Sequence, residues 1–120
     1  MPQEIHFDIP IDQPDRAQQF YCQLFGWTMQ KAPGHDLEYW VVRASEGDAL
    51  GGLVLRGAPN HATVNYYTVL SIDEALRKVQ ELGGRVTVPK AAIPHVGYNA
   101  QCTDTEGNTF GLWENDRAAR

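Results

Sequence analysis

The chain has 120 residues, 42% hydrophobic and 10% aromatic, with a formal net charge of −5 at pH 7, which predicts one domain with a modest core. The negative charge argues against nucleic acid and anionic membranes as partners, because both require a basic face, and it favours a neutral or cationic small organic molecule. No apolar run reaches the ~20 residues of a membrane span, and MPQEIHFDIP lacks a signal-peptide pattern, so we expect a cytoplasmic protein.

Residues 5–11 predict a β-strand, because apolar and polar side chains alternate along them. The apolar face carries Ile5, Phe7, Ile9 and Ile11, and the other face carries Glu4, His6, Asp8 and Pro10. Residues 12–26 predict a helix with Asp12 as its cap, Pro14 in its first turn and Gly26 as its stop. Its apolar stripe is expected to cover the apolar face of the strand, and comprises Ala17, Phe20, Tyr21, Leu24 and Phe25.

Three strand candidates follow, at 27–31, 37–44 and 49–56, so the first half has the order β-α-β-β-β. The second half repeats this order with a strand at 63–70, a helix at 71–84 and strands at 85–89, 97–103 and 108–115. Ser71 and Glu74 form a capping-box pattern at the start of the second helix, and Gly83 and Gly84 mark its end.

The two halves also share a short sequence pattern. TEGNTFGLWE at 105–114 resembles SEGDALGGLV at 45–54, and an offset of 60 positions pairs Gly111 with Gly51 and Phe110 with Leu50. We interpret this as two copies of one supersecondary unit that together close one structure. The predicted class is α+β, with two tandem modules at about 3–57 and 62–116 of a single 1–120 domain.

Three segments resemble the vicinal oxygen chelate superfamily, which includes glyoxalase I, bleomycin-resistance proteins and extradiol dioxygenases. They are HFDIPIDQPDRAQQFYCQLFGW, SIDEALRKVQELGGRVTVPKAAIPHVGY and DTEGNTFGLWE. The resemblance implies two βαβββ modules that form curled mixed sheets around a cleft, with helices on the outer face and commonly a homodimer. It does not select an activity, because this superfamily includes lyases, isomerases, dioxygenases and drug-sequestering proteins.

In metal-dependent relatives, the first and last strands of each module supply His, Gln or Glu to a divalent ion. The resemblance places these positions at His6, Gly51, Asn65 and Gly111 of this chain. Only His6 is a good donor for a transition metal, whereas a catalytic site usually has three protein ligands. We therefore expect no metal centre, and the alternative is a divalent ion that involves His6.

Alternation along the strands extends this expected cleft face to further side chains. The expected ligand-binding residues are His6, Asp8, Trp40, Asn65, Tyr67 and Trp113, with Leu53 beyond Gly51. Gly51 and Gly111 are expected to leave room for a ligand, and the alternative is that they reflect strand-edge geometry. Trp40 and Trp113 have an equally good interpretation as core or dimer-interface anchors, and His6 has one as a structural hydrogen-bond partner.

Two further features have plain interpretations. Cys22 and Cys102 are expected to be reduced and largely buried. PKAAIPHVGY, at 89–98, predicts a loop that is either an ordinary connector or a flap over the cleft.

Three functions fit these observations. The first is a metal-free, glyoxalase-like protein that binds a small organic molecule. The second is an enzyme, a lyase or isomerase of the lactoylglutathione lyase type, in which His6 helps to hold the ion. The third is a protein that sequesters a cationic aromatic drug. No catalytic residue is assigned from the sequence.

Overall fold

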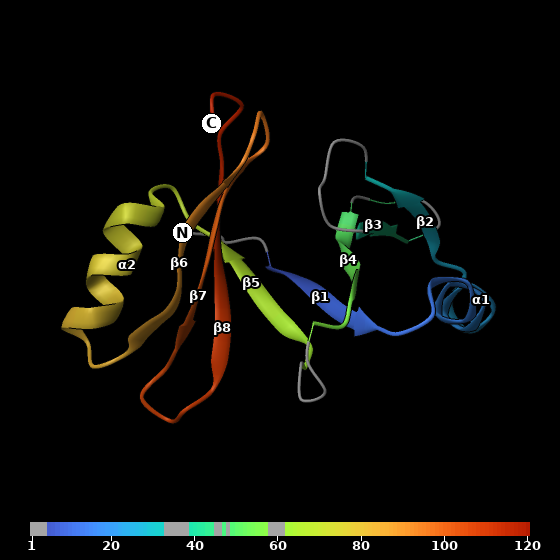
Figure 1. Cartoon of the computed structure of the whole chain (residues 1–120), viewed down its shortest axis with the longest axis horizontal. Helices are drawn as coiled ribbons and strands as arrows, with labels where there is room; N and C mark the ends of the chain where they lie inside the picture. The colour runs from blue at the N-terminus through green and yellow to red at the C-terminus, as the bar shows by residue number, and fades with distance from the viewer. Residues whose placement is uncertain (1–4, 33–38, 45–46, 48, 58–61) are drawn as a thin grey trace. The chain divides into compact units, whose positions relative to one another are not determined.

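The computed structural model describes residues 5–32, 39–44, 47, 49–57 and 62–120 (Figure 1). Its elements divide into two compact units, one from His6 to Thr63 and one that contains Val64–Arg120. Each unit has the order β-α-β-β-β, which confirms the predicted α+β class and the duplicated module. The extent of the domain and of its modules stays a prediction. Among the described residues, no helix has the length and apolarity of a membrane span.

The first module contains one helix and four strands. They are β1 (Ile5–Ile11), α1 (Pro14–Phe25), β2 (Thr28–Lys31), β3 (Tyr39–Arg43) and β4 (Ala49–Leu55). The strands lie in the order β2-β3-β4-β1, with β1 parallel to β4 and the other pairs antiparallel. Leu37 and Glu38, which were expected to begin the third strand, lie outside the described residues.

The core of the first module lies on one face of this sheet. Its buried residues are Ile11, Trp40, Val42 and Leu53, and Phe7, Ile9, Ala17, Tyr21, Trp27 and Met29 pack against them. Because side chains alternate along a strand, His6 and Asp8 lie on the opposite face of β1 from Phe7 and Ile9. The predicted division of β1 into an apolar and a polar face is confirmed.

The second module repeats this plan. Its elements are β5 (Val64–Thr68), α2 (Ile72–Glu81), β6 (Arg85–Ile93), β7 (Gly97–Thr103) and β8 (Thr109–Asn115). The strands lie in the order β5-β8-β7-β6, with β5 parallel to β8. Ile72 of α2 packs against Ala100, Cys102 and Leu112 in a second core, on the face of the sheet that α2 covers.

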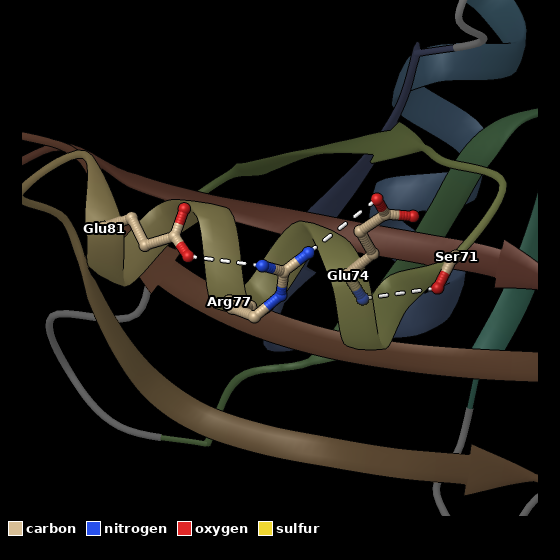
Figure 2. Close-up of polar contacts among 4 residues, drawn as sticks. All are labelled: Ser71, Glu74, Arg77 and Glu81. Atoms are coloured by element: carbon tan, nitrogen blue, oxygen red, sulfur yellow. Dashed lines mark hydrogen bonds and ion pairs between the residues drawn. The ribbon is translucent and has the colours of Figure 1, made fainter.

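Helix α2 begins as the capping pattern predicts. The Ser71 hydroxyl accepts a hydrogen bond from the Glu74 backbone N–H at 3.2 Å (Figure 2). Arg77 on the exposed side of α2 reaches Glu81 at 3.3 Å and Glu74 at 3.8 Å. Gly83 follows the helix with a φ of 98°, so the predicted stop is also confirmed.

Helix α1 corrects two expectations. Its N-cap is Gln13, without a side-chain cap, whereas the Asp12 carboxylate accepts a hydrogen bond from Arg56 Nε at 3.1 Å. The apolar stripe covers the core only in part, because Phe20, Leu24 and Phe25 remain 59%, 56% and 54% exposed. The ends at Pro14 and Gly26 are as predicted, with Gly26 in the left-handed conformation.

Two smaller expectations are also wrong. The segment 89–98, predicted as a loop, is largely strand: β6 continues to Ile93, which pairs with Gly97 at the start of β7 in a hairpin. Both cysteines are free, as expected, but only Cys102 is buried and Cys22 is exposed. Cys22 lies on α1, no residue of which is buried.

Candidate functional site

The face of the first module opposite its core carries a tyrosine that spans three strands. The Tyr39 hydroxyl on β3 donates a hydrogen bond to Asp8 Oδ1 on β1 at 2.9 Å. Strand β4 lies between β3 and β1, so the ring must cross it, and it does so at Gly52. A Cβ atom at Gly52 would overlap the ring and hydroxyl of Tyr39. Glycine is therefore required for the contact between Tyr39 and Asp8.

The second module contains an equivalent arrangement. Gln101 Nε2 on β7 donates a hydrogen bond to the Tyr66 hydroxyl on β5 at 2.9 Å. Here the middle strand is β8, and a Cβ atom at Gly111 would stand 2.7 Å from Tyr66 Cγ and closer still to other ring atoms. We call these two arrangements tyrosine bridges: Tyr39–Gly52–Asp8 and Tyr66–Gly111–Gln101.

The carboxyl group of Asp8, in the first bridge, has a raised pKa. Burial raises the pKa of Asp8 from 3.8 to about 6, and the hydrogen bond from Tyr39 partly opposes this increase. In the described part of the chain, the hydrogen bond found for the Asp8 carboxyl is the one from Tyr39 to Oδ1. A carboxylate accepts through both of its oxygens, so Oδ2 retains the capacity to accept a further hydrogen bond.

The raised pKa predicts how Asp8→Asn changes stability with pH. Because the folded protein holds the Asp8 proton more tightly than the unfolded chain, this group makes wild-type stability fall as pH rises from about 4 to about 6. The loss is at most ~3 kcal/mol, at about 1.4 kcal/mol per pKa unit. Asparagine cannot ionise, yet its side-chain oxygen can still accept the hydrogen bond from the Tyr39 hydroxyl.

Denaturant unfolding at pH 4 and pH 7 measures this effect. The free energy of unfolding of Asp8→Asn, relative to wild type, should rise between the two pH values, whereas Asp15→Asn on the exposed first turn of α1 should show no such rise. A relative stability of Asp8→Asn that is the same at both pH values would contradict a protonated Asp8 in the folded state.

The expected cleft residues do not all share a face. Trp40 is a buried member of the first core, together with Leu53, so neither lies beside His6 and Asp8. Tyr67 lies on the face of Phe110, with ring centroids 6.1 Å apart, and Phe110 packs against the second core. Asn65 is the neighbour of Tyr66 on β5, so its side chain points to the other face of the sheet from Tyr66 and Gly111. The expectation that these residues share one cleft face is therefore wrong for Trp40, Leu53, Asn65 and Tyr67. Their roles in ligand contact stay a prediction.

Trp113 does lie on the face of Gly111, because both occupy alternate positions of β8. Its Nε1 donates a hydrogen bond to Asn115 Oδ1 at 2.8 Å. Its ring also lies close to Gly97 of β7, where a Cβ atom would stand 2.7 Å from Trp113 Cζ2. The second module therefore presents Tyr66, Trp113 and Gln101 on one face, a set with no ionised group.

The two glycines do not leave open space for a ligand. Any side chain at Gly51 would collide with the Phe7 main chain, whose nitrogen lies 2.7 Å from the Cβ position. The space above Gly111 is filled by the Tyr66 ring. The expectation that these glycines open a pocket is wrong, because one is needed for close approach of strands and the other for an aromatic ring.

The metal positions implied by the resemblance do not fit an ion. Gly51 and Gly111 offer no donor, and Asn65 lies on the other face of its sheet from Gly111. His6 remains as the one imidazole among these positions, and transition-metal sites usually require three protein ligands. Within the described ranges, no three His, Cys, Asp or Glu residues are grouped closely enough to hold an ion.

The repeat in the sequence indicates Tyr66, rather than Asn65, as the residue of the second module that corresponds to His6. The offset of 60 that relates Gly51 to Gly111 relates His6 to Tyr66, not to Asn65. A shift of one position along a strand moves a side chain to the opposite face of the sheet. Tyr39, Gly52 and Gln101 had no such signal, because their importance depends on contacts across three strands.

Comparison with known proteins identifies the family. Residues 5–112 match the model of the Glyoxalase/Bleomycin resistance protein/Dioxygenase superfamily, and the chain belongs to this superfamily. It is 35% identical over 111 residues to “Putative glyoxylase CFP32” of Mycobacterium bovis and of Mycobacterium tuberculosis. That match covers 88% of this chain but only 41% of each relative, so the chain spans about two fifths of their length.

Solved structures agree on the fold. Methylmalonyl-CoA epimerase from Mycobacterium tuberculosis has a TM-score of 0.70 at 13% identity, with 92% of this chain and 86% of that chain covered. A superfamily member from Vibrio splendidus has a TM-score of 0.68 at 13% identity, with 96% and 100% covered. At these identities the similarity establishes the architecture and leaves the chemistry to the residues of this chain.

Proposed function

We propose that the chain binds a small organic molecule, without the metal centre of its metal-dependent relatives, on the face of the first module that carries His6, Asp8 and Tyr39. The observation that supports this proposal is the first tyrosine bridge. It fixes a largely buried carboxyl group on a strand, with one oxygen occupied by Tyr39 and the other still able to accept a hydrogen bond. A small number of fixed polar groups that orient the ligand is typical of small-molecule sites.

The arrangement also favours a ligand that donates a hydrogen bond. Above a pH of about 6, ionised Asp8 accepts from a neutral or cationic donor, and a hydrogen bond to a charged group contributes more than one between neutral groups. Sequestration of a cationic aromatic drug is a narrower form of the same proposal. The lyase or isomerase alternative requires ligands that the implied positions do not supply. The cytoplasmic location and the homodimer stay predictions.

Calorimetry tests the metal-free part of the proposal. Chelator-treated protein, titrated with nickel, zinc or manganese, should show no stoichiometric binding at micromolar concentrations. One-to-one binding that His6→Ala abolishes would instead favour the metal-dependent enzyme. Asn65→Ala is the matched control, because Asn65 lies on the opposite face of its sheet from Gly111.

Fragment screening tests the binding part. A library of small hydrogen-bond donors, followed by amide chemical shifts, should perturb Asp8, Tyr39 and Gly52 together at pH 7.5. Asp8→Asn should weaken the best fragment about tenfold or more, and Asp15→Asn should not. If all fragments leave these amides unchanged, or if both variants behave alike, the proposed binding face is wrong.

A further inference from the structure

A concave surface lies on the face of β1 opposite Asp8. A cavity of about 320 Å³ is open to solvent where β1 ends and α1 begins. This volume is at the lower end of the ~300–1,000 Å³ range of small-molecule sites. Ile9 and Ile11 contribute to it from β1, on the face opposite Asp8. The lining includes none of His6, Asp8 and Tyr39, so the cavity is separate from the proposed binding face.

One guanidinium of the cavity wall is held in place. Arg56 Nε donates to Asp12 Oδ1 at 3.1 Å, and Arg56 Nη2 donates to the Pro10 carbonyl at 3.3 Å. The Arg56 side chain is only 31% exposed, which is consistent with a fixed position. Asp12 balances its charge.

The second guanidinium adds a further positive charge. Arg16 is exposed in the first turns of α1 and lines the same cavity, and no hydrogen bond or ion pair to it is found among residues that the structure describes. With Arg16, Arg56 and Asp12 counted together, the wall carries a net charge of +1 in a chain whose formal charge is −5. An anion is therefore attracted here despite the overall charge.

Aromatic surface lies next to this charge. Phe20 follows Arg16 by four positions on α1, so both side chains lie on the same side of the helix. Phe20 is 59% exposed, and its ring makes an edge contact with Tyr21 at a centroid distance of 5.2 Å. Ile9, Ile11 and Ala17 complete an apolar floor.

We propose that this cavity binds a small organic anion with a planar apolar body, of the aryl carboxylate class. Arg16 pairs with the carboxylate, because a guanidinium offers a planar fork of donors that matches two carboxylate oxygens. The apolar body lies against Phe20 and the isoleucine floor. The site is independent of the function proposed above, since it uses the other face of the sheet.

The probes for this site are 4-fluorobenzoate and its neutral analogue 4-fluorobenzamide, followed by ¹⁹F and amide chemical shifts. We expect 4-fluorobenzoate to perturb the amides of Arg16, Ala17 and Phe20 and to bind more tightly than 4-fluorobenzamide. Arg16→Gln should weaken 4-fluorobenzoate about tenfold or more and leave 4-fluorobenzamide unchanged. Phe20→Ala, at an exposed position, should weaken both probes.

Arg85→Gln is the matched control, because it removes the same charge from an exposed position of the second module. Equal weakening by Arg16→Gln and Arg85→Gln would mean a general charge effect and would overturn the proposal. Perturbation confined to amides outside the cavity would overturn it too, as would equal affinity for the two probes. Unchanged spectra at millimolar 4-fluorobenzoate would have the same consequence.

Discussion

Gly51→Ala should destabilise the protein by at least ~3 kcal/mol, a large part of the ~5–15 kcal/mol that stabilises a typical domain. The added methyl group would overlap the carbonyl of Phe7 on the neighbouring strand, and Gly51 also has a φ of 157°. Main-chain atoms of a sheet cannot move aside as a flexible side chain can. Thermal and denaturant unfolding measure the loss.

Gly47→Ala is the control for this substitution. Its new methyl group would stand 3.7 Å from the Ala44 side chain, which is an ordinary contact. The free energy of unfolding of this variant should therefore stay within about 1 kcal/mol of the wild-type value. If Gly51→Ala is as stable as Gly47→Ala, β1 and β4 are not as close as their pairing indicates.

Gly111→Ala should cost about 2–4 kcal/mol in the wild-type chain, but less than about 1 kcal/mol when Tyr66 is alanine. The reason is that the three atoms nearest to the new methyl group all belong to the Tyr66 ring, so removal of the ring removes the closest collisions. The difference between the two costs is the coupling energy of a double-mutant cycle, obtained from four unfolding curves.

Two controls make this cycle specific. Gly107→Ala has no atom within 4 Å of the new methyl group, so its cost, which arises from a φ of 82°, should be the same with and without Tyr66→Ala. Gly111→Ala costs that are equal in both backgrounds would show that backbone conformation, rather than the tyrosine bridge, requires this glycine.

The order and type of the elements were predictable because local signals are strong here. Alternation defined β1, and Pro14, Gly26, Ser71 and Gly83 placed the ends of both helices. The cap of α1 was not predictable, because Asp12 has a competing partner 44 positions away in Arg56. Local sequence gives no indication of that ion pair.

The facing of the aromatic residues could not be predicted in the same way. Trp40 and Tyr67 lie in LEYWVVRA and TVNYYTVL, where aromatic and aliphatic side chains occupy both faces. Alternation fixes which neighbours share a face, but without a polar face it cannot tell which one is inside. Cross-strand contacts decide this, and they place Trp40 in the core and Tyr39 over Gly52.

The tyrosine bridges also differ in a way that bears on the history of the duplication. In the first module the tyrosine comes from β3 and reaches β1, whereas in the second it comes from β5, the counterpart of β1, and reaches the counterpart of β3. The offset of 60 relates Tyr39 to Asn99 and Gln101 to Val41, so neither bridge is a copy of the other. Each glycine is therefore tied sterically to the ring above it, independently of the other module, and a larger residue on the middle strand becomes acceptable only after the tyrosine has been replaced.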